Sequence, residues 1–167
     1  MYNQLTKKDI EDMQKEIEDR KVRVRPKLLE AVKEARAHGD LSENFEYYAA
    51  KKEKNKNESR ISLLERMRRT AEVIDESTTA DEIGVNETVT VLFEEDSTQE
   101  EFTIVSTMRS DSLKGLVSIE SPIGKALLGH KVDDRVEIHV NKEYSYFVRV
   151  LKIAKDNKGE EAAIRSF

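Results

Sequence analysis

The chain has 167 residues, of which 38% are charged and 37% are hydrophobic, and its formal net charge is -5. It contains no cysteine, which excludes disulfide frameworks and thiolate zinc sites and makes a reducing compartment the expectation. No apolar run approaches the roughly 20 residues that cross a bilayer, and the N-terminus lacks the apolar core of a signal peptide, so we expect a cytoplasmic protein without a membrane partner.

Charges are segregated along the chain in a way that the net charge conceals. Between Lys51 and Arg69 there are eight basic residues against three acidic ones, whereas Glu72 to Glu101 holds eleven acidic residues and no basic one. Such blocks produce local potentials, so the N-terminal part could face an anionic partner. Ion pairs along a solvated stalk explain the same charges equally well.

The N-terminal part predicts two long helices that form an antiparallel hairpin. Thr6 and Asp9 make a capping-box pattern at the start of the first helix, and Gly39 suits a left-handed residue at its end. Pro26 removes a backbone donor within this helix, so we expect a kink or a break there. Residues 51–59 are almost entirely polar, which predicts a middle held partly by charge pairs. The helical period is carried by apolar residues at steps of three, four or their multiples: Ile10, Met13, Ile17, Val24, Leu28, Ala31 and Ala35, then Leu64, Met67, Ala71 and Ile74.

The turn of the hairpin carries two carboxylates, Asp40 and Glu43. Asp40 is placed to cap the second helix, and residues 40–43 fit a capping box in which both carboxylates accept backbone hydrogen bonds. Alternatively, two carboxylates at this spacing can face the same side and offer the oxygen ligands that Mg²⁺ prefers. The residues alone favour the capping role, and the two roles do not exclude each other.

Other side chains around the turn have two possible uses each. We expect Tyr47 and Tyr48 to pack between the helices, with stacking on a nucleobase as the alternative. We expect His38, beside Gly39, to help end the first helix, and no histidine is given a catalytic role.

After the acidic block the period of the sequence changes to two, which predicts a sheet. Ser121, Pro122 and Gly129 mark the cap, the first turn and the stop of one short helix between the third and fourth strands. The predicted fold class is α+β, with a coiled-coil hairpin at residues 1–76, a small antiparallel β-sheet domain with one short helix at 80–153 and a C-terminal extension at 154–167. The tail from residue 156 shows no period and is expected to be loosely held. The five predicted strands span residues 87–93, 101–106, 115–120, 135–140 and 144–151.

The motifs carry a family resemblance that covers about Thr6 to Ile153. The sequence resembles the bacterial GreA/GreB transcript cleavage factors, and within that family it is most similar to the GreA type. The residues that carry the resemblance are Ala35-Arg36-Ala37-His38-Gly39-Asp40-Leu41-Ser42-Glu43-Asn44, Glu46-Tyr47, Ala49-Ala50, Ala71-Glu72-Val73-Ile74-Asp75, Ser121-Pro122-Ile123 and Leu127-Leu128-Gly129.

The resemblance implies a fold, a partner and a set of site residues. It implies that the second domain is FKBP-like, and that the protein acts as a monomer on bacterial RNA polymerase. The hairpin would enter the secondary channel of the polymerase and promote endonucleolytic cleavage of backtracked nascent RNA near its 3′ end. Asp40 and Glu43 would stabilise a second Mg²⁺ shared with the polymerase and position water, since neither is expected to hold a metal alone.

Further roles also follow from the resemblance. Arg36 and Lys51 would contact the extruded RNA or the channel, while Glu120 and Pro122 would dock on the coiled coil at the rim of the channel. The protein would not be an enzyme on its own.

Two alternatives remain open at the level of sequence. A related protein could occupy the same channel and inhibit the polymerase without stimulating cleavage. This alternative is kept because the chain departs from the family pattern, notably around Asp9, where a glycine is usual. An FKBP-like fold also suggests a prolyl isomerase, but no apolar, aromatic-lined proline pocket is evident in the sequence.

Overall fold

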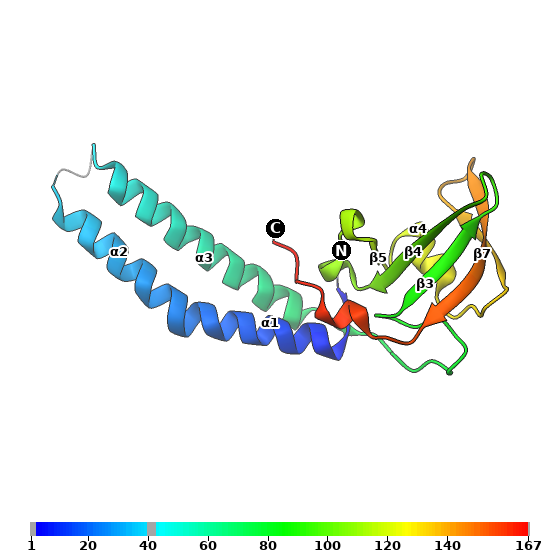
Figure 1. Cartoon of the computed structure of the whole chain (residues 1–167). Helices are drawn as coiled ribbons and strands as arrows, with labels where there is room; N and C mark the ends of the chain where they lie inside the picture. Colours follow the sequence, from blue (N-terminus) through cyan, green and yellow to red (C-terminus); the bar gives the residue numbers. More distant parts are fainter. Residues whose placement is uncertain (1–2, 40–42, 167) are drawn as a thin grey trace. The chain divides into compact units, whose positions relative to one another are not determined.

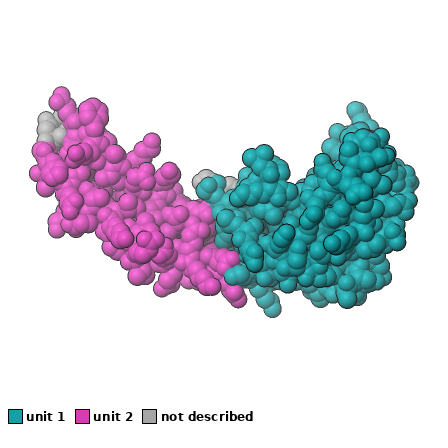
Figure 2. Space-filling model, viewed as in Figure 1, with its two compact units in different colours: residues 1–9, 72–166 teal, residues 10–71, 167 magenta. Residues whose placement is uncertain are grey.

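The computed structural model describes residues 3–39 and 43–166, which form two compact units (Figures 1 and 2). One unit spans residues 10–71, and the other joins the described part of residues 1–9 to residues 72–166. Within these ranges no helix combines the length and the apolar character that spanning a membrane requires.

The hairpin is built from three α-helices and one π-helical segment (Figure 1). The first arm consists of α1 (Lys7–Asp19), the π-helix Arg20–Val24 and α2 (Arg25–Ala37), and the second arm is α3 (Phe45–Arg69). Two long helical arms therefore match the prediction.

The start of α1 confirms the predicted capping box. The backbone N–H of Thr6 donates to Asp9 Oδ2 at 2.9 Å, and the backbone N–H of Asp9 donates to Thr6 Oγ1 at 3.1 Å. Both residues are buried, so the cap satisfies two donors that water cannot reach.

The irregularity predicted at Pro26 takes the form of the π-helix that precedes it. Pro26 is the second residue of α2, and Val24 before it already has helical φ and ψ, so the chain is helical on both sides of the proline. The backbone N–H of Arg25 bonds Arg20 O, which widens the turn before the proline. This extra residue gives the proline ring room beside the preceding turn, so the arm continues as a helix through the position that would otherwise break it.

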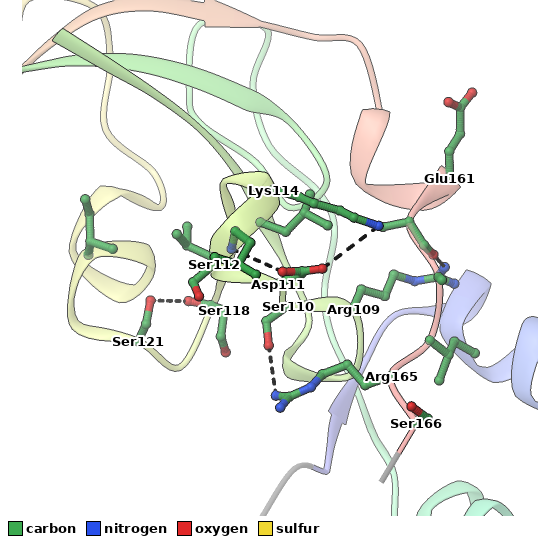
Figure 3. A pocket seen from close by; sticks show the side chains of 17 residues that line it. Arg109, Ser110, Asp111, Ser112, Lys114, Ser118, Ser121, Glu161, Arg165 and Ser166 are labelled. Carbon is green, nitrogen blue, oxygen red and sulfur yellow. Dashed lines mark hydrogen bonds and ion pairs between the residues drawn. The ribbon is translucent and has the colours of Figure 1, made fainter.

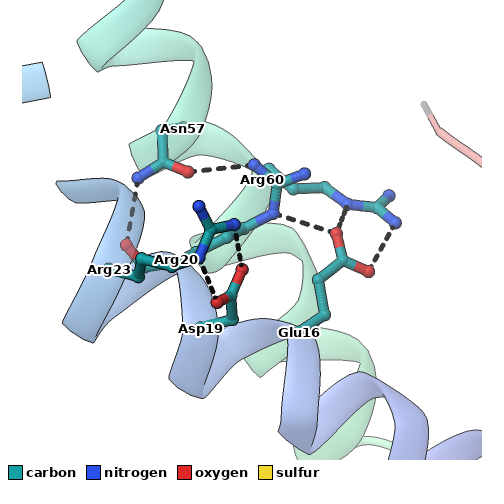
Figure 4. Close-up of polar contacts among 6 residues, drawn as sticks. All are labelled: Glu16, Asp19, Arg20, Arg23, Asn57 and Arg60. Atoms are coloured by element: carbon teal, nitrogen blue, oxygen red, sulfur yellow. Dashed lines mark hydrogen bonds and ion pairs between the residues drawn. The ribbon is translucent and has the colours of Figure 1, made fainter. Parts of the chain in front are cut away.

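The middle of the hairpin is joined by polar side chains, as its composition predicted (Figure 4). Glu16 accepts from Arg60 Nε and from Arg20 Nε, both at 2.9 Å, and Arg20 also donates to Asn57 Oδ1 at 2.9 Å. Burial raises the pKa of Glu16, but the hydrogen bonds from the two arginines outweigh it and lower the pKa overall. Two further ion pairs cross between the arms, Arg25 with Glu58 and Lys21 with Glu65.

The second unit contains a five-stranded mixed sheet with the strand order β5-β4-β3-β7-β6. All five predicted strands are present, although their ends differ by a few residues. Three of the four pairings are antiparallel, as predicted, but β4 and β5 pair in parallel. The parallel pair follows from the two short 3-10 helices between these strands, which replace a hairpin turn. The strands are β3 (Thr88–Phe93), β4 (Thr98–Val105), β5 (Leu116–Ser118), β6 (Arg135–His139) and β7 (Ser145–Ala154).

The short helix α4 (Pro122–Leu127) covers part of the sheet core, and its predicted signals are confirmed. Ser121 caps it by accepting from the backbone N–H of Gly124 at 3.1 Å, and Gly129 follows with φ +82°. A Cβ at Gly124 would lie 2.0 Å from Ser118 O, so only glycine permits this close approach.

Two features of this unit were absent from the sequence prediction. A small parallel sheet pairs β1 (Gln4–Leu5) with β2 (Glu72–Val73). The expectation of a loosely held tail was wrong, because a 3-10 helix forms at Lys158–Glu161 and the backbone N–H of Arg165 bonds Met108 O at 2.7 Å. The tail can be ordered with few apolar residues, since these hydrogen bonds are made by backbone groups.

Candidate functional site

The side chain of Asn44 joins the end of α2 to the start of α3. Asn44 is the N-cap of α3, and its Oδ1 accepts from the backbone N–H of Tyr47 at 3.0 Å. Its Nδ2 donates to Ala35 O in α2 at 2.6 Å. One side chain therefore satisfies an orphan donor of one helix and a carbonyl near the end of the other.

The first helix ends as predicted. The backbone N–H of His38 bonds Ala35 O at 3.2 Å, and Gly39 follows with φ +128°, a value that glycine tolerates and other residues rarely adopt.

The predicted cap of the second helix was wrong. Asn44 takes that role in place of Asp40, because α3 begins at Phe45. Glu43 precedes the N-cap and so cannot be the third helical residue of a capping box at the start of α3. Glu43 is exposed, and Asp40 lies outside the described residues.

Two predicted basic residues meet at one aromatic ring. Tyr47 is 8% exposed, which confirms its predicted packing role, but Tyr48 is 51% exposed, so the same prediction was wrong for Tyr48. The Arg36 guanidinium lies 5.3 Å from the centroid of the Tyr47 ring and donates to the Tyr47 hydroxyl at 3.3 Å, while Lys51 Nζ lies 6.0 Å from the same centroid. The hydrogen bond from Arg36 lowers the pKa of the Tyr47 phenol. Both cations remain exposed and are held near the turn by cation–π attraction.

Three other side chains lie around a shallow hollow at the turn. His38 Nδ1 and Glu46 Oε2 are 3.2 Å apart, and both side chains are exposed. Phe45, which also lines this hollow, is 85% exposed. Sequence reasoning passed over both Phe45 and Asn44, although an asparagine directly before a helical segment is a recognised N-cap signal.

The predicted docking residues lie in the sheet-containing unit. Glu120 accepts from Thr107 Oγ1 at 2.6 Å, which orients its carboxylate, and Pro122 is exposed at the start of α4. Both line a groove that also contains Lys125, Arg135 and His139. The structure thus brings Glu120 and Pro122 together on one groove.

A broader pocket in the same unit contains none of the predicted site residues (Figure 3). It is bounded by the 3-10 helices before β5 and by the C-terminal tail. Arg165 Nη1 donates to Ser110 Oγ across it at 3.3 Å, and Lys114 Nζ lies 4.0 Å from Asp111 Oδ2. These polar groups are bonded to one another and identify no specific ligand.

No group of three or more histidine, aspartate or glutamate side chains that could hold a metal ion occurs in the two described ranges.

Comparison with known proteins identifies the family. The profile described as transcription elongation factor, N-terminal, matches residues 3–73, and that described as transcription elongation factor, GreA/GreB, C-term, matches residues 77–155. Transcription elongation factor GreA of Lachnoclostridium phytofermentans is 39% identical over 156 residues, which is 93% of this chain and 97% of that protein. GreA of Chloroherpeton thalassium is 45% identical over 83% of this chain and 88% of that protein.

The chain belongs to the GreA/GreB family of transcription elongation factors.

Among solved structures, GreA factor homolog 1 (Gfh1) of Thermus thermophilus is 26% identical to this GreA/GreB family member. The match covers 92% of this chain and 99% of that one, with a TM-score of 0.42. A second structure, described as the transcription factor Gfh1, is 26% identical over 92% of this chain and 97% of that one, with a TM-score of 0.45.

The bridge made by Asn44 gives a first prediction for this family member. Asn44→Ala should lower the free energy of unfolding of the hairpin by about 1–2 kcal/mol, because it removes the cap of α3 and the bond to Ala35. Asn44→Asp keeps a capping oxygen but loses the amide donor, so it isolates the bridge to α2. Urea unfolding followed by circular dichroism at 222 nm measures both. Equal stability of wild type and Asn44→Ala would contradict the assigned role.

Proposed function

We propose that this family member binds bacterial RNA polymerase through its secondary channel and stimulates the polymerase's own cleavage of backtracked nascent RNA. The turn of the hairpin is the part that acts at the polymerase active site. In this proposal the protein supplies carboxylates and contacts but carries out no reaction alone.

The observation that carries the proposal is the position of Glu43. Because Asn44 caps α3, Glu43 lies before the helix and is not part of a capping box at the start of α3. The Glu43 carboxylate is exposed and lies outside the helix, next to the Asn44 side chain that joins α2 and α3, so it is accessible to an external ligand.

The chemistry of Mg²⁺ fits the proposed donor set. Carboxylate oxygens are preferred ligands of Mg²⁺, which keeps several waters and is commonly held by one or two carboxylates. Glu43, together with Asp40, would add ligands to an ion that the polymerase holds only partly. A bound second ion supplies charge stabilisation and an activated water for phosphodiester hydrolysis.

The remaining site residues receive contact roles. Arg36 and Lys51, which lie beside the Tyr47 ring, are proposed to contact phosphates of the nascent RNA or the channel. The Glu120 carboxylate, oriented by Thr107, and the exposed Pro122 are proposed to dock on the coiled coil at the rim of the channel. Contacts of Arg36 and Lys51 to phosphate predict binding that weakens as salt rises.

The proposal is tested on backtracked RNA polymerase complexes that carry end-labelled RNA. With Mg²⁺ present, the protein should raise the rate of cleavage near the RNA 3′ end at least about 100-fold over that of the polymerase alone. The reason is that a second bound metal ion stabilises the transition state by several kcal/mol. Sequencing gels over time provide the rate. Binding that blocks nucleotide addition without faster cleavage would replace the proposal with an inhibitory role in the same channel.

A further inference from the structure

An aromatic ring at the start of α3 is almost fully exposed. Phe45 is 85% exposed and is the first residue of α3. A hydrophobic staple would pair the residue before the N-cap with the fourth helical residue, which here are Glu43 and Tyr48, so Phe45 takes no part in one. Phenylalanine is also a weaker helix former than alanine or glutamate. Among the described residues, the ring therefore takes part in neither the cap of α3 nor a hydrophobic staple.

A second aromatic and a cation continue the same face of α3. Tyr48 follows Phe45 by three residues and Lys52 follows Tyr48 by four, so the three side chains share one side of the helix. Tyr48 is 51% exposed, and Lys52 is exposed as well. The tilted Tyr47 ring, 5.5 Å from that of Tyr48, supports Tyr48 from the buried side.

Exposed aromatics in line with a cation are a combination that binds single-stranded nucleic acid. Bases stack on such rings whatever their sequence, while lysine and arginine meet the phosphates. The charges around Phe45 favour a base over a phosphate at this ring. Glu43 and Glu46 flank it and repel phosphate, whereas Lys52 lies two helical turns farther along.

We propose that Phe45 is a stacking site for the unpaired nucleobase at the 3′ end of backtracked RNA, and that Tyr48 and Lys52 extend this site along α3. The inference rests on the proposed function, because that function brings the turn to the RNA. Stacking would hold the displaced strand beside the carboxylates and so position the scissile phosphate. Phe45 is thus a substrate-binding residue and adds to the contacts of Arg36 and Lys51.

The test uses matched variants at position 45 and a direct physical readout. Phe45→Leu keeps apolar bulk but cannot stack, whereas Phe45→Tyr keeps the ring. Backtracked complexes carry 5-iodouridine as the unpaired 3′ nucleotide and are irradiated in buffer without Mg²⁺, which prevents cleavage. The crosslinked protein is then mapped by mass spectrometry. Cleavage is measured separately in Mg²⁺ as a function of protein concentration.

The proposal predicts that wild type and Phe45→Tyr crosslink at residue 45 and that Phe45→Leu loses at least about 90% of this crosslink. Phe45→Leu should also need roughly five- to tenfold more protein for half-maximal cleavage, the scale expected from the loss of one stacked base. Crosslinking that maps away from residue 45 would overturn the proposal. A third variant, Phe45→Ala, removes both the ring and the apolar bulk. If Phe45→Ala needs more protein for half-maximal cleavage and Phe45→Leu does not, the proposal is also overturned, because Phe45 then packs on an apolar surface of the polymerase.

The two proposals can fail separately. If wild type does not accelerate cleavage, the proposed function fails, whereas the crosslink in buffer without Mg²⁺ still reports whether the 3′ base lies on Phe45.

Discussion

Replacing Asp40 by asparagine and Glu43 by glutamine should abolish stimulation of transcript cleavage while leaving polymerase binding within about twofold of wild type. The amides match the carboxylates in shape but lack the negative charge that makes a carboxylate a good Mg²⁺ ligand. Loss of a metal contribution of several kcal/mol lowers the stimulated rate by at least about 100-fold. Rates are measured from gels of labelled RNA, and binding by competition with labelled protein.

Glu46→Gln is the matched control for this pair. Glu46 is another exposed carboxylate at the turn, and it already faces His38 at 3.2 Å. Its neutralisation should leave the cleavage rate within about threefold of wild type, because a screened surface pair contributes little. If the control and the double variant lose the same fraction of the stimulated cleavage rate, overall negative charge at the turn, and not two specific metal ligands, accounts for the stimulation.

Raising the Mg²⁺ concentration separates a ligand role from a structural one. A variant that has lost ligands but kept its shape should recover part of its activity as Mg²⁺ increases, since mass action offsets the weaker site. A variant with a distorted turn should not. The circular dichroism spectrum provides an independent check on the fold.

Local signals explain why much of the fold could be predicted from the sequence. Thr6 with Asp9, Gly39, and Ser121 with Pro122 act within a few residues of themselves, and the structure confirms all of them. The helical and strand periods are also local signals, because each depends only on the spacing of apolar residues within one element. The cap of α3 was misassigned because Asp40 and Asn44 are both good N-cap residues, and the choice depends on how far the loop extends.

The features that were missed depend on contacts distant in sequence. The parallel pairing of β4 with β5, the small sheet of β1 with β2 and the ordered tail all join segments that no local pattern relates. The exposure of Phe45 belongs to the same class, since sequence spacing could not show which of the aromatic residues near the turn is buried. The types and spacing of the candidate site residues could be read from the sequence, but only the structure shows that Arg36 and Lys51 lie at the same Tyr47 ring.

Asp9 shows how such a distant contact can dominate stability. The sequence offered no reason for a carboxylate at this position beyond the cap. In the structure Asp9 is bound by Arg109, a residue 100 positions away, and the two side chains are only 1% and 2% exposed. Arg109 also donates to the carbonyl oxygens of Glu160, at 3.3 Å, and Ala162. One guanidinium therefore joins the start of α1, the segment after β4 and the C-terminal tail.

Arg109→Met should lower the free energy of unfolding by about 3–5 kcal/mol, because it leaves the Asp9 carboxylate buried without its cation. Methionine preserves most of the apolar length of the arginine side chain, so the loss reports on charge and hydrogen bonds more than on packing. Asp9→Asn retains an oxygen that can accept from Thr6 while removing the charge. Combining it with Arg109→Met should cost clearly less than the sum of the two single variants, since the buried charge is then gone.

Urea unfolding of all four proteins in this cycle measures the coupling between Asp9 and Arg109, and limited proteolysis follows the tail. We expect faster cleavage after residue 156 in both variants that lack Arg109, because the carbonyls of Glu160 and Ala162 lose their donor. In the Asp9→Asn protein the tail should stay protected. A loss below about 1 kcal/mol for Arg109→Met would mean that solvent reaches Asp9 in the native state and that the tail is held by its backbone bonds alone.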